Sequence, residues 1–496
     1  MYSTSYKCLE KRFKRIGVLK EALSLLEWDR AVLMPPGAVG SRSIQLSEIN
    51  LIIHELLCDK KTEDLLLAAE SDPPEDNLHR ANLIEMRRAH SHANAVDSEL
   101  IEAITKASSE CEMCWRGARE EKDFSQIIEK FSNLLLLVKE KSQAKSSIFG
   151  CSPYESLMDQ YEPGLREPET DQFFNELLEF LPNIFERGLE RQKGKSPITP
   201  EGPFSIEKQK VLAKNIMNSL GFNFKKGRLD TSLHPFCGGV PNDVRLTTRY
   251  SEENFIQSFM GVLHETGHAL YEANLPDDWQ LQPAGFARGM ALHESQSLFI
   301  EMQVCRSPEF FEFSAPLLRQ IFDGSGPAWS AKNLYSLCST VSPSLIRVDA
   351  DEVTYPFHII MRYRLEKALI SGELAVVDLP DAWNSEIKRL LDVSPPDDSQ
   401  GCLQDIHWYS GAFGYFPTYT MGALAAAQIS SAIRCAFPDY HDMIKRGNFG
   451  DITEWTKHHI HSKASFLDTN EILIQATGRP LGTNDFRLHL ESRYLH

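Results

Sequence analysis

The stretch "FMGVLHETGHALYEANL", residues 259–275, combines an apolar helical pattern with two histidines and a glutamate. Its apolar residues recur three and four positions apart, which predicts a largely buried helix, and Ser251 upstream is the predicted N-cap. His264 and His268 are four residues apart, so a helix places both imidazoles on one face, about one turn from each other. Two imidazoles in this H-E-x-x-H arrangement can share one tetrahedral metal ion. Glu265 then lies close enough to hydrogen-bond a water on that ion.

The same spelling also fits an ordinary helix, because histidines one turn apart occur in protein cores and on protein surfaces. A second histidine cluster, "TKHHIHSKA" at 456–464, lacks a neighbouring carboxylate and an apolar setting. It is predicted to be a solvated helix face. The metal interpretation of residues 259–275 therefore depends on a third ligand elsewhere in the chain.

Three glutamates are candidates for that ligand. Glu272 continues along the first helix and would have to reach back over a full turn. Glu294 and Glu301 lie on a second apolar-periodic segment, "GFARGMALHESQSLFIEMQV" at 285–304, and are about 10 Å apart along a helix, so only one of them can reach the metal. An antiparallel return of the chain after residue 275 would bring Glu294 level with the histidines. Its neighbour His293 is a supporting or substrate-binding candidate.

Composition limits the class of protein. The chain has 496 residues, 42% hydrophobic, with a net charge of −17 and no basic block, which argues against a nucleic-acid partner. No stretch approaches the roughly 20 apolar residues of a membrane helix, and no signal sequence is recognisable at the start. The ten cysteines show no disulfide framework, and Cys111 and Cys114 are read as two thiols on one helical face. A cytoplasmic protein is expected.

Helical periodicity dominates the chain, and strand-like alternation is scarce. The clearest candidate strand is "DVRLTTRYSEE", which begins at residue 243 and follows a Gly- and Pro-rich turn. No segment is long enough to be a flexible linker. The sequence therefore predicts a mainly α-helical fold with a small sheet near the metal site. Residues 1–496 are expected to form one catalytic unit, with an N-terminal helical portion over about 1–200 and a metal-site portion over about 201–496.

Further motifs along the chain match one known family in order. "HPF" at 234–236, "DVRLT" at 243–247, "HETGH" at 264–268, "HES" at 293–295, "IRVDAD" at 346–351 and "GCLQDIHW" at 401–408 together resemble the carboxypeptidase Taq family of zinc metallocarboxypeptidases. The resemblance implies a helical body enclosing a deep groove, usually as a homodimer. It implies His264, His268 and Glu294 as zinc ligands, with Co²⁺ or Mn²⁺ as alternative metals. Glu265 would be the general base and acid.

The downstream segment "HWYSGAFGYFPTY" supplies candidates for stabilising the oxyanion of a peptide-bond hydrolysis. Resemblance to helical zinc peptidases at large, which use a downstream histidine and tyrosine, points to His407 and Tyr419. Tyr415 is a further candidate for substrate binding. The alternative for each of these side chains is core packing among the neighbouring aromatic residues.

An enzyme that acts at the C-terminus of a peptide must recognise a free carboxylate, and an arginine fork pairs with both of its oxygens. Arg347 is the first candidate, and its alternative is an ion pair with Asp349. Arg245 is the second, and its alternative is an ion pair with Asp243. The "DVRLT" strand is a candidate edge for a substrate strand, and His234 is expected to face the same cleft. Asp405 is expected either to orient a neighbouring group or to be structural.

These features together predict a metallocarboxypeptidase that hydrolyses the C-terminal bond of peptides with broad specificity. One alternative is a zinc endo-oligopeptidase or dipeptidyl carboxypeptidase on a similar helical scaffold, with the same metal chemistry. A second is a non-catalytic helical binding protein that retains the motif. The intact Glu265 argues against the second alternative, because a decayed site would be expected to lose its base.

Overall fold

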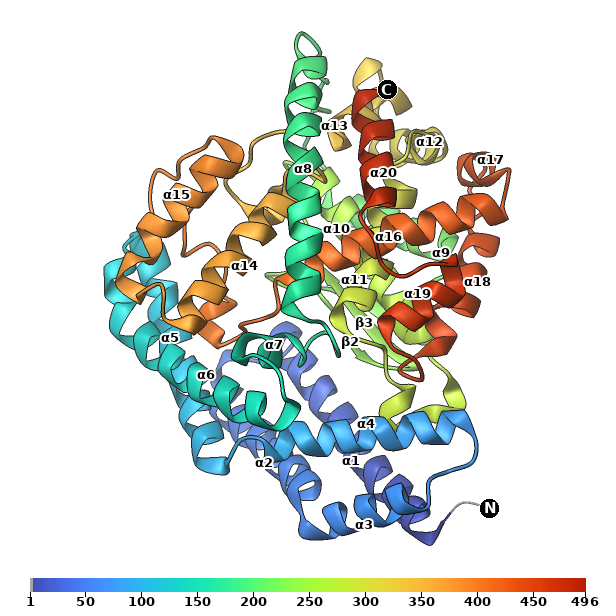
Figure 1. Cartoon of the computed structure of the whole chain (residues 1–496). Coiled ribbons are helices and arrows are strands. Elements are labelled where there is room, and N and C mark those ends of the chain that lie inside the picture. The colour runs from blue at the N-terminus through green and yellow to red at the C-terminus, as the bar shows by residue number, and fades with distance from the viewer. Residues whose placement is uncertain (1–2) are drawn as a thin grey trace.

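The computed structural model describes residues 3–496, which form a mainly helical body with one small sheet (Figure 1). The predicted fold class is confirmed. Helices α1 to α4 lie together at one end of the molecule and share a core of their own, built from buried apolar residues of all four. The first eight helices are α1 (Thr4–Val32), α2 (Val39–Cys58), α3 (Lys60–Ser71), α4 (Asn77–Asn94), α5 (Ser98–Glu121), α6 (Ile128–Phe149), α7 (Pro153–Met158) and α8 (Glu167–Gln192).

A larger core begins in α5 and continues to the last helix, so the helices before residue 200 share apolar packing with those after it. The C-terminal helix packs against both α8 and α16, as Figure 1 shows for α8. The later helices are α9 (Ile206–Ser219), α10 (Phe255–Ala273), α11 (Met290–Leu298), α12 (Pro308–Phe322), α13 (Ala331–Cys338), α14 (Tyr355–Ser371), α15 (Leu379–Leu391), α16 (Pro417–Ala436), α17 (Tyr440–Lys445), α18 (Gly450–His459), α19 (Thr469–Thr477) and α20 (Asn484–Leu495).

The sheet has three strands, β1 (Gly227–Thr231), β2 (Cys237–Val240) and β3 (Asp243–Thr248), in the order β1-β3-β2. β1 pairs with β3 in parallel and β2 pairs with it in antiparallel fashion. The "DVRLT" strand is therefore the central strand, and both of its edges are already hydrogen-bonded. The hypothesis that it offers an edge to a substrate strand is wrong, because the sequence before it supplies a partner on each side.

Helix α10 lies between the sheet and α11, and α16 packs on α11 in turn. Two glycines allow this close approach. A Cβ on Gly267 would lie 2.3 Å from the carbonyl oxygen of Gln296 on α11, and a Cβ on Gly422 of α16 would lie 2.9 Å from Cβ of Glu294. Only hydrogen fits at these two positions, so the glycines determine how near the three helices come to each other.

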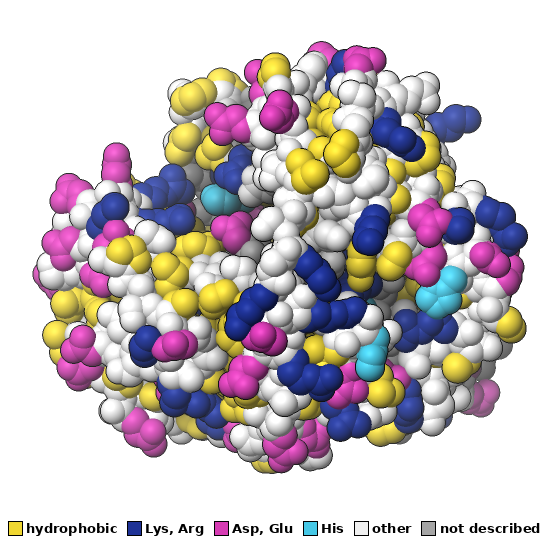
Figure 2. All heavy atoms as spheres, turned by 90° about the horizontal axis from the view of Figure 1, so that it is seen from above, with side chains coloured by type: hydrophobic (Ala, Val, Ile, Leu, Met, Phe, Trp, Pro, Cys, Tyr) yellow, Lys and Arg dark blue, Asp and Glu magenta, His cyan; other side chains and the backbone are white. Residues whose placement is uncertain are grey.

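The surface is hollowed between two parts of the body, and Figure 2 shows basic side chains, a histidine and an acidic side chain within the hollow. A cavity of about 450 Å³ lies between α1, α4 and the start of α11, and its lining includes Lys20, Glu85, Arg288 and His293. Across residues 3–496, no helix combines the length and the apolar character needed to cross a membrane.

Candidate metal centre

Helix α10 carries the two histidines on a buried segment. Leu263, Thr266 and Gly267 are fully or almost fully buried around them. The helix begins at Phe255, and its N-cap is Asn254, whose side chain accepts a hydrogen bond from the backbone of Ile256. The prediction of Ser251 as the N-cap is wrong, since Ser251 instead accepts a hydrogen bond from the backbone N–H of Glu253 in the preceding turn.

His264, His268 and Glu294 converge. One ligand-type atom from each lies within 4.8 Å of the others. Nε2 of His268 is 3.2 Å and Nε2 of His264 is 3.8 Å from Oε2 of Glu294. A tetrahedral ion with ligands at about 2.0–2.1 Å needs ligand atoms roughly 3.3 Å apart. These spacings, and a donor set of two imidazole nitrogens and one carboxylate oxygen, fit a catalytic zinc ion.

The other nitrogen of each histidine is held by a neighbouring side chain. Nδ1 of His264 lies 2.9 Å from Oε2 of Glu301, and Nδ1 of His268 lies 2.7 Å from Nδ1 of His293. Partners on Nδ1 orient each imidazole and leave Nε2 free to face the centre. His293 is thus placed as a supporting residue.

The other two candidate glutamates, Glu272 and Glu301, contact the histidines at their outer nitrogens. Glu301 accepts a hydrogen bond from Arg306 at 2.6 Å on its second oxygen, and Glu272 lies 2.8 Å from Nε2 of His293. Glu301 therefore contacts His264 and Glu272 contacts His293, and both lie outside the group of three converging atoms. Glu301 lies in a π-helical segment, η5 (Phe299–Cys305), that continues α11, although the sequence predicted one regular helix there.

The electrostatics of the cluster favour a cation at its centre. Burial lowers the pKa of His264, but the carboxylates of Glu294, Glu301 and Glu265 outweigh burial and raise it to about 10. Burial, reinforced by the carboxylates of Glu294 and Glu301, raises the pKa of Glu265 to about 7. Burial, reinforced by His293 and His264, lowers the pKa of His268 to about 4. The carboxylates of Glu294, Glu301 and Glu265 stabilise a positive charge placed between them. The two Nε2 atoms face this position.

The N-terminus of α11 is fixed by a buried acid from the loop after α7. Glu162 accepts hydrogen bonds from the backbone of Ala291 at 2.8 Å and from the hydroxyl of Thr469. A carboxylate at this end of a helix satisfies free N–H groups and favours the helix dipole. The contact sets the position of α11, and with it that of Glu294.

Tyr419, Tyr415 and His407 form an aromatic group beside the cluster. Nε2 of His407 lies 3.4 Å from the hydroxyl of Tyr419, and the rings of Tyr415 and Tyr419 are 5.2 Å apart. Burial raises the pKa of Tyr419 to about 12 and lowers that of His407 to about 4, so the tyrosine stays protonated and the histidine neutral. Tyr419 lies one turn before Gly422 on α16, and Gly422 packs against Glu294, so this group lies near the cluster.

Arg347 is buried and is held by Asp405. Its Nη2 donates to Asp405 at 2.8 Å, its Nη1 to the hydroxyl of Tyr355 at 3.2 Å, and its guanidinium carbon lies 5.0 Å from the centre of the Tyr419 ring. The predicted alternative, an ion pair with Asp349, is wrong, because Asp349 is exposed on the same short turn. Asp405 takes the orienting role that the sequence had left open.

Arg245 and His234 are not brought to the ligands. Arg245 pairs with Asp243 at 2.5 Å and lies over the Trp28 ring at 4.6 Å, whereas its neighbours Val244 and Leu246 pack against α10. Strand alternation therefore turns Arg245 to the face away from the metal cluster. His234 is exposed in the turn before β2.

The prediction that the second histidine cluster, residues 456–464, forms a solvated helix face is only partly correct. His458 is exposed, but His461 is buried and its Nε2 lies 3.0 Å from the side-chain oxygen of Gln296 on α11. The expected solvated face therefore ends before residue 461. The chain turns inward after α18, and this change of direction has no local signal.

Arg362 and Glu366 were missed by the sequence analysis. Both lie on α14 with fully buried side chains, four residues apart. A partial signal was available, because "YPFHIIMRYRLEKALI" mixes apolar residues with five basic or acidic ones, and Arg362 and Glu366 lie one helical turn apart within it; the sequence does not show which of the five are buried. Buried charges need partners, so such a pair indicates a polar network inside the helical body.

Comparison with known proteins gives a consistent picture. The family model described as carboxypeptidase Taq (M32) metallopeptidase matches residues 8–494. Thermostable carboxypeptidase 1 of Thermus thermophilus is 36% identical over 506 aligned positions, which cover 99% of this chain and 98% of that protein. Carboxypeptidase 1 of Bacillus subtilis is 32% identical, with 98% of each chain covered. The solved structure of Trypanosoma cruzi metallocarboxypeptidase 1 superposes with a TM-score of 0.96 at 39% identity, covering 99% of both chains.

Proposed function

Because this chain belongs to the carboxypeptidase Taq (M32) metallopeptidase family, we propose that His264, His268 and Glu294 hold its catalytic metal as a zinc ion. The enzyme is a metallocarboxypeptidase, and peptides are its substrates. The convergence of the three ligand-type atoms within 4.8 Å is the observation that carries the proposal. When bound, the ion supplies a Lewis acid that polarises the scissile carbonyl and acidifies the attacking water.

Glu265 is the proposed general base and acid. It follows the first histidine on α10, and its side chain is buried beside the cluster. Burial raises its pKa to about 7, so near neutral pH it can take a proton from the attacking water and return it to the leaving amine.

Tyr419 and His407 are the proposed donors to the oxyanion. The protonated phenol and the neutral imidazole can each offer a hydrogen to a developing negative charge. Nε2 of His407 lies 3.4 Å from the hydroxyl of Tyr419, which supports a shared role for the two side chains. Tyr415, packed against both side chains, is proposed to shape the substrate site.

Arg347 is the proposed site for the C-terminal carboxylate. It lies beside Tyr419, on the side of the cluster where the oxyanion donors stand, and Tyr355 and Asp405 fix its orientation. A carboxylate held here would leave the last peptide bond near the metal, which is the geometry that release of one C-terminal residue requires. Arg245 and His234 are proposed only for more distant contacts with a peptide.

Three further expectations extend the proposal. We propose that the chain works as a single catalytic unit over residues 1–496, since apolar packing continues from α5 to α20. A homodimer is proposed from the family alone. A cytoplasmic location is proposed because all ten cysteines, each within the described residues, are free thiols, which suits a reducing compartment.

Two measurements test the function. Glu265→Gln should keep the metal, because the residue is no ligand, yet lose activity by several orders of magnitude, because the base is gone. Turnover equal to that of the parent enzyme would remove Glu265 from the mechanism. The second measurement compares the cleavage rates of one N-blocked peptide as the free acid and as the C-terminal amide. Equal rates would exclude carboxylate recognition and indicate an endo-oligopeptidase.

A further inference from the structure

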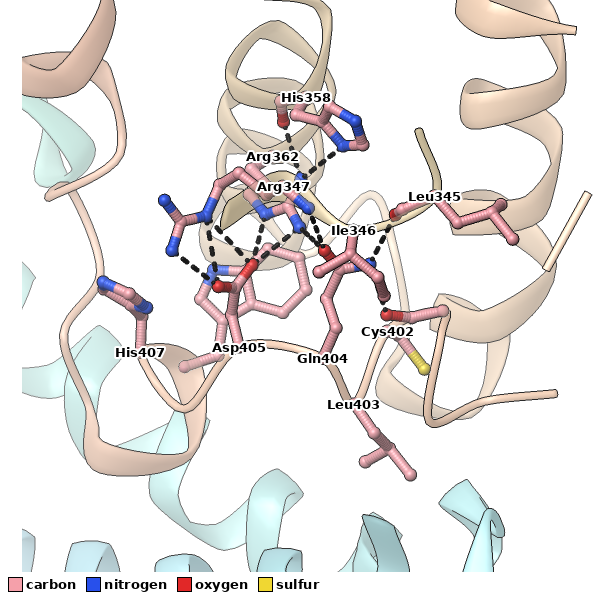
Figure 3. Close-up of polar contacts among 12 residues, drawn as sticks. Leu345, Ile346, Arg347, His358, Arg362, Cys402, Leu403, Gln404, Asp405 and His407 are labelled. Carbon is pink, nitrogen blue, oxygen red and sulfur yellow. Dashed lines mark hydrogen bonds and ion pairs between the residues drawn. The ribbon is translucent and has the colours of Figure 1, made fainter. Parts of the chain in front are cut away.

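Arg362 is a fully buried arginine on α14 that lies outside the motifs matched by the family resemblance. Its guanidinium donates to three different acceptors: Nε to Asp405 at 2.8 Å, Nη2 to the side-chain oxygen of Gln404 at 2.8 Å, and Nη1 to the carbonyl of His358 at 2.9 Å. Figure 3 shows it and Arg347 on the same Asp405 carboxylate. Because its side chain has no exposed surface, Arg362 cannot touch a substrate directly.

Asp405 is shared between the two arginines. Arg347 binds mainly one oxygen, Oδ1, at 2.8 Å, and Arg362 binds the other, Oδ2, at 2.6 Å. The exposed fractions of the three side chains are 7%, 0% and 11% for Arg347, Arg362 and Asp405. One carboxylate balances one guanidinium, so this buried group of three keeps one net positive charge.

Among residues 3–496, no other carboxylate forms an ion pair with either arginine. His358 is neutral, because burial lowers its pKa to about 3, and His407 is neutral for the same reason. Glu366, one turn along α14, directs its oxygens to Tyr154, Trp408 and the backbone of Gly414 instead. An uncompensated buried cation is costly, and an anion that reaches it is bound strongly.

We propose that Arg362 is a positioning residue for substrate binding, which engages Asp405 so that Arg347 keeps a net positive charge for the C-terminal carboxylate of the peptide. Without Arg362, Asp405 would neutralise Arg347 alone, and the pair would offer little attraction to a second carboxylate. The inference rests on the proposed role of Arg347 in carboxylate binding.

Arg362 also acts on the backbone of Arg347. The side-chain oxygen of Gln404 accepts from Nη2 of Arg362 and from the backbone N–H of Arg347 at 2.9 Å. The Nε2 group of Gln404 in turn donates to the carbonyl of Leu345 at 3.1 Å (Figure 3). Charge and orientation at Arg347 are therefore controlled from one helix.

The test is a charge-rescue experiment on the holoenzyme. Arg362→Gln should raise KM for an N-blocked peptide acid about tenfold to a hundredfold, the range expected for losing one charge-assisted hydrogen bond, with a smaller change in kcat. Arg362→Gln combined with Asp405→Asn removes both opposing charges and should lower KM by about threefold or more relative to Arg362→Gln, although not to the parent value, because the amide orients Arg347 less firmly than the carboxylate. A merely structural role predicts a double variant at least as impaired as the single one, and that result overturns the inference.

Two further variants keep the outcome clear. Arg347→Gln should abolish the preference for the free acid over the amide, and a preserved preference would refute the proposed role of Arg347. If Arg347→Gln is impaired but Arg362→Gln keeps the parent KM, only the role inferred for Arg362 is refuted. Arg362→Lys preserves the charge and serves if Arg362→Gln does not fold, as judged by thermal unfolding and zinc content. Its KM should lie between those of the parent and Arg362→Gln, because a lysine keeps the charge but loses the fork that also holds Gln404. A KM in folded Arg362→Lys equal to that of Arg362→Gln would show that charge is not the cause.

Discussion

Replacing Gly267 by alanine should separate the two helices that carry the proposed metal ligands. The new Cβ would lie 2.3 Å from the carbonyl oxygen of Gln296 and 2.5 Å from Cα of Ser297, whereas ordinary contact begins near 3.4 Å. Both contacts are backbone atoms, so no side-chain rotation relieves them, and α11 must move by about 1 Å. Glu294 lies two residues from Gln296 on this helix and would move with it.

The displacement is large compared with the tolerance of the site. Oε2 of Glu294 is 3.2 Å from Nε2 of His268. An additional 1 Å approaches the separation of about 4 Å that two ligands on opposite sides of one zinc ion can span at most. We expect a fall of about a hundredfold in kcat/KM, weaker zinc binding by about 10- to 100-fold, and a loss of about 1–3 kcal/mol of stability from overpacking.

Gly261→Ala is the matched control, because Gly261 lies on the same helix and a Cβ there meets no atom within 4 Å. Alanine should stabilise this position by about 0.5–1 kcal/mol, since glycine loses more backbone freedom on folding. Zinc titration, steady-state kinetics and thermal unfolding of the two variants give the comparison. Zinc affinity and kcat/KM within twofold of the parent in Gly267→Ala would refute the claim that this contact places Glu294.

Three other predictions concern the metal and the pH dependence of stability. Glu294→Ala should lose bound zinc. Glu272→Ala and Glu301→Ala should keep zinc with affinity lower by about 10- to 100-fold, because these two glutamates act only through the histidines. Metal analysis of the purified variants that shows the reverse would reassign the third ligand. Chelation should lower the unfolding temperature, and zinc at a hundred times its Kd should restore about 2.7 kcal/mol, while His268→Ala should show no such response. Glu352 is fully buried and accepts hydrogen bonds from Arg493 at 2.8 Å and from Tyr494 at 2.8 Å. Burial raises the pKa of Glu352, but the charges of Arg493 and His489 outweigh burial and hold this pKa well below its usual range. Its contribution is therefore present above the unfolded pKa of about 4.3 and is lost as the pH falls. Glu352→Gln should cost about 3–5 kcal/mol at neutral pH, and its deficit relative to the parent should shrink below about pH 4 in denaturant titrations; a deficit independent of pH would contradict the assignment.

The proposed ligand set could be derived from the sequence because it depends on short-range geometry. The spacing of His264 and His268 fixes their common face on any helix, and an antiparallel return was enough to choose Glu294 over Glu272 and Glu301. The helical class followed from periodicity for the same reason. These features need only the backbone of one or two elements.

Features that depend on distant segments were predicted incorrectly or not at all. Arg347 pairs with Asp405, 58 residues away, and not with nearby Asp349. β3 is a central strand because β1, more than ten residues earlier, pairs with it in parallel. Arg362 was overlooked, since its partner Asp405 comes from a loop in another part of the chain. Local pattern carries no information about which distant side chain satisfies a buried charge.

The sequence by itself determined the helical class, the paired histidines with a glutamate beside them, and the second helix that carries the third carboxylate. Tertiary structure decided how these groups meet. Contacts at Gly267 and Gly422 set the spacing of α10, α11 and α16. Glu301 and His293 orient the two imidazoles, and two buried arginines share the carboxylate of one aspartate. Periodicity arises from backbone geometry within a few residues, whereas the distances and charges of the site arise from close packing between segments that only the folded chain brings together.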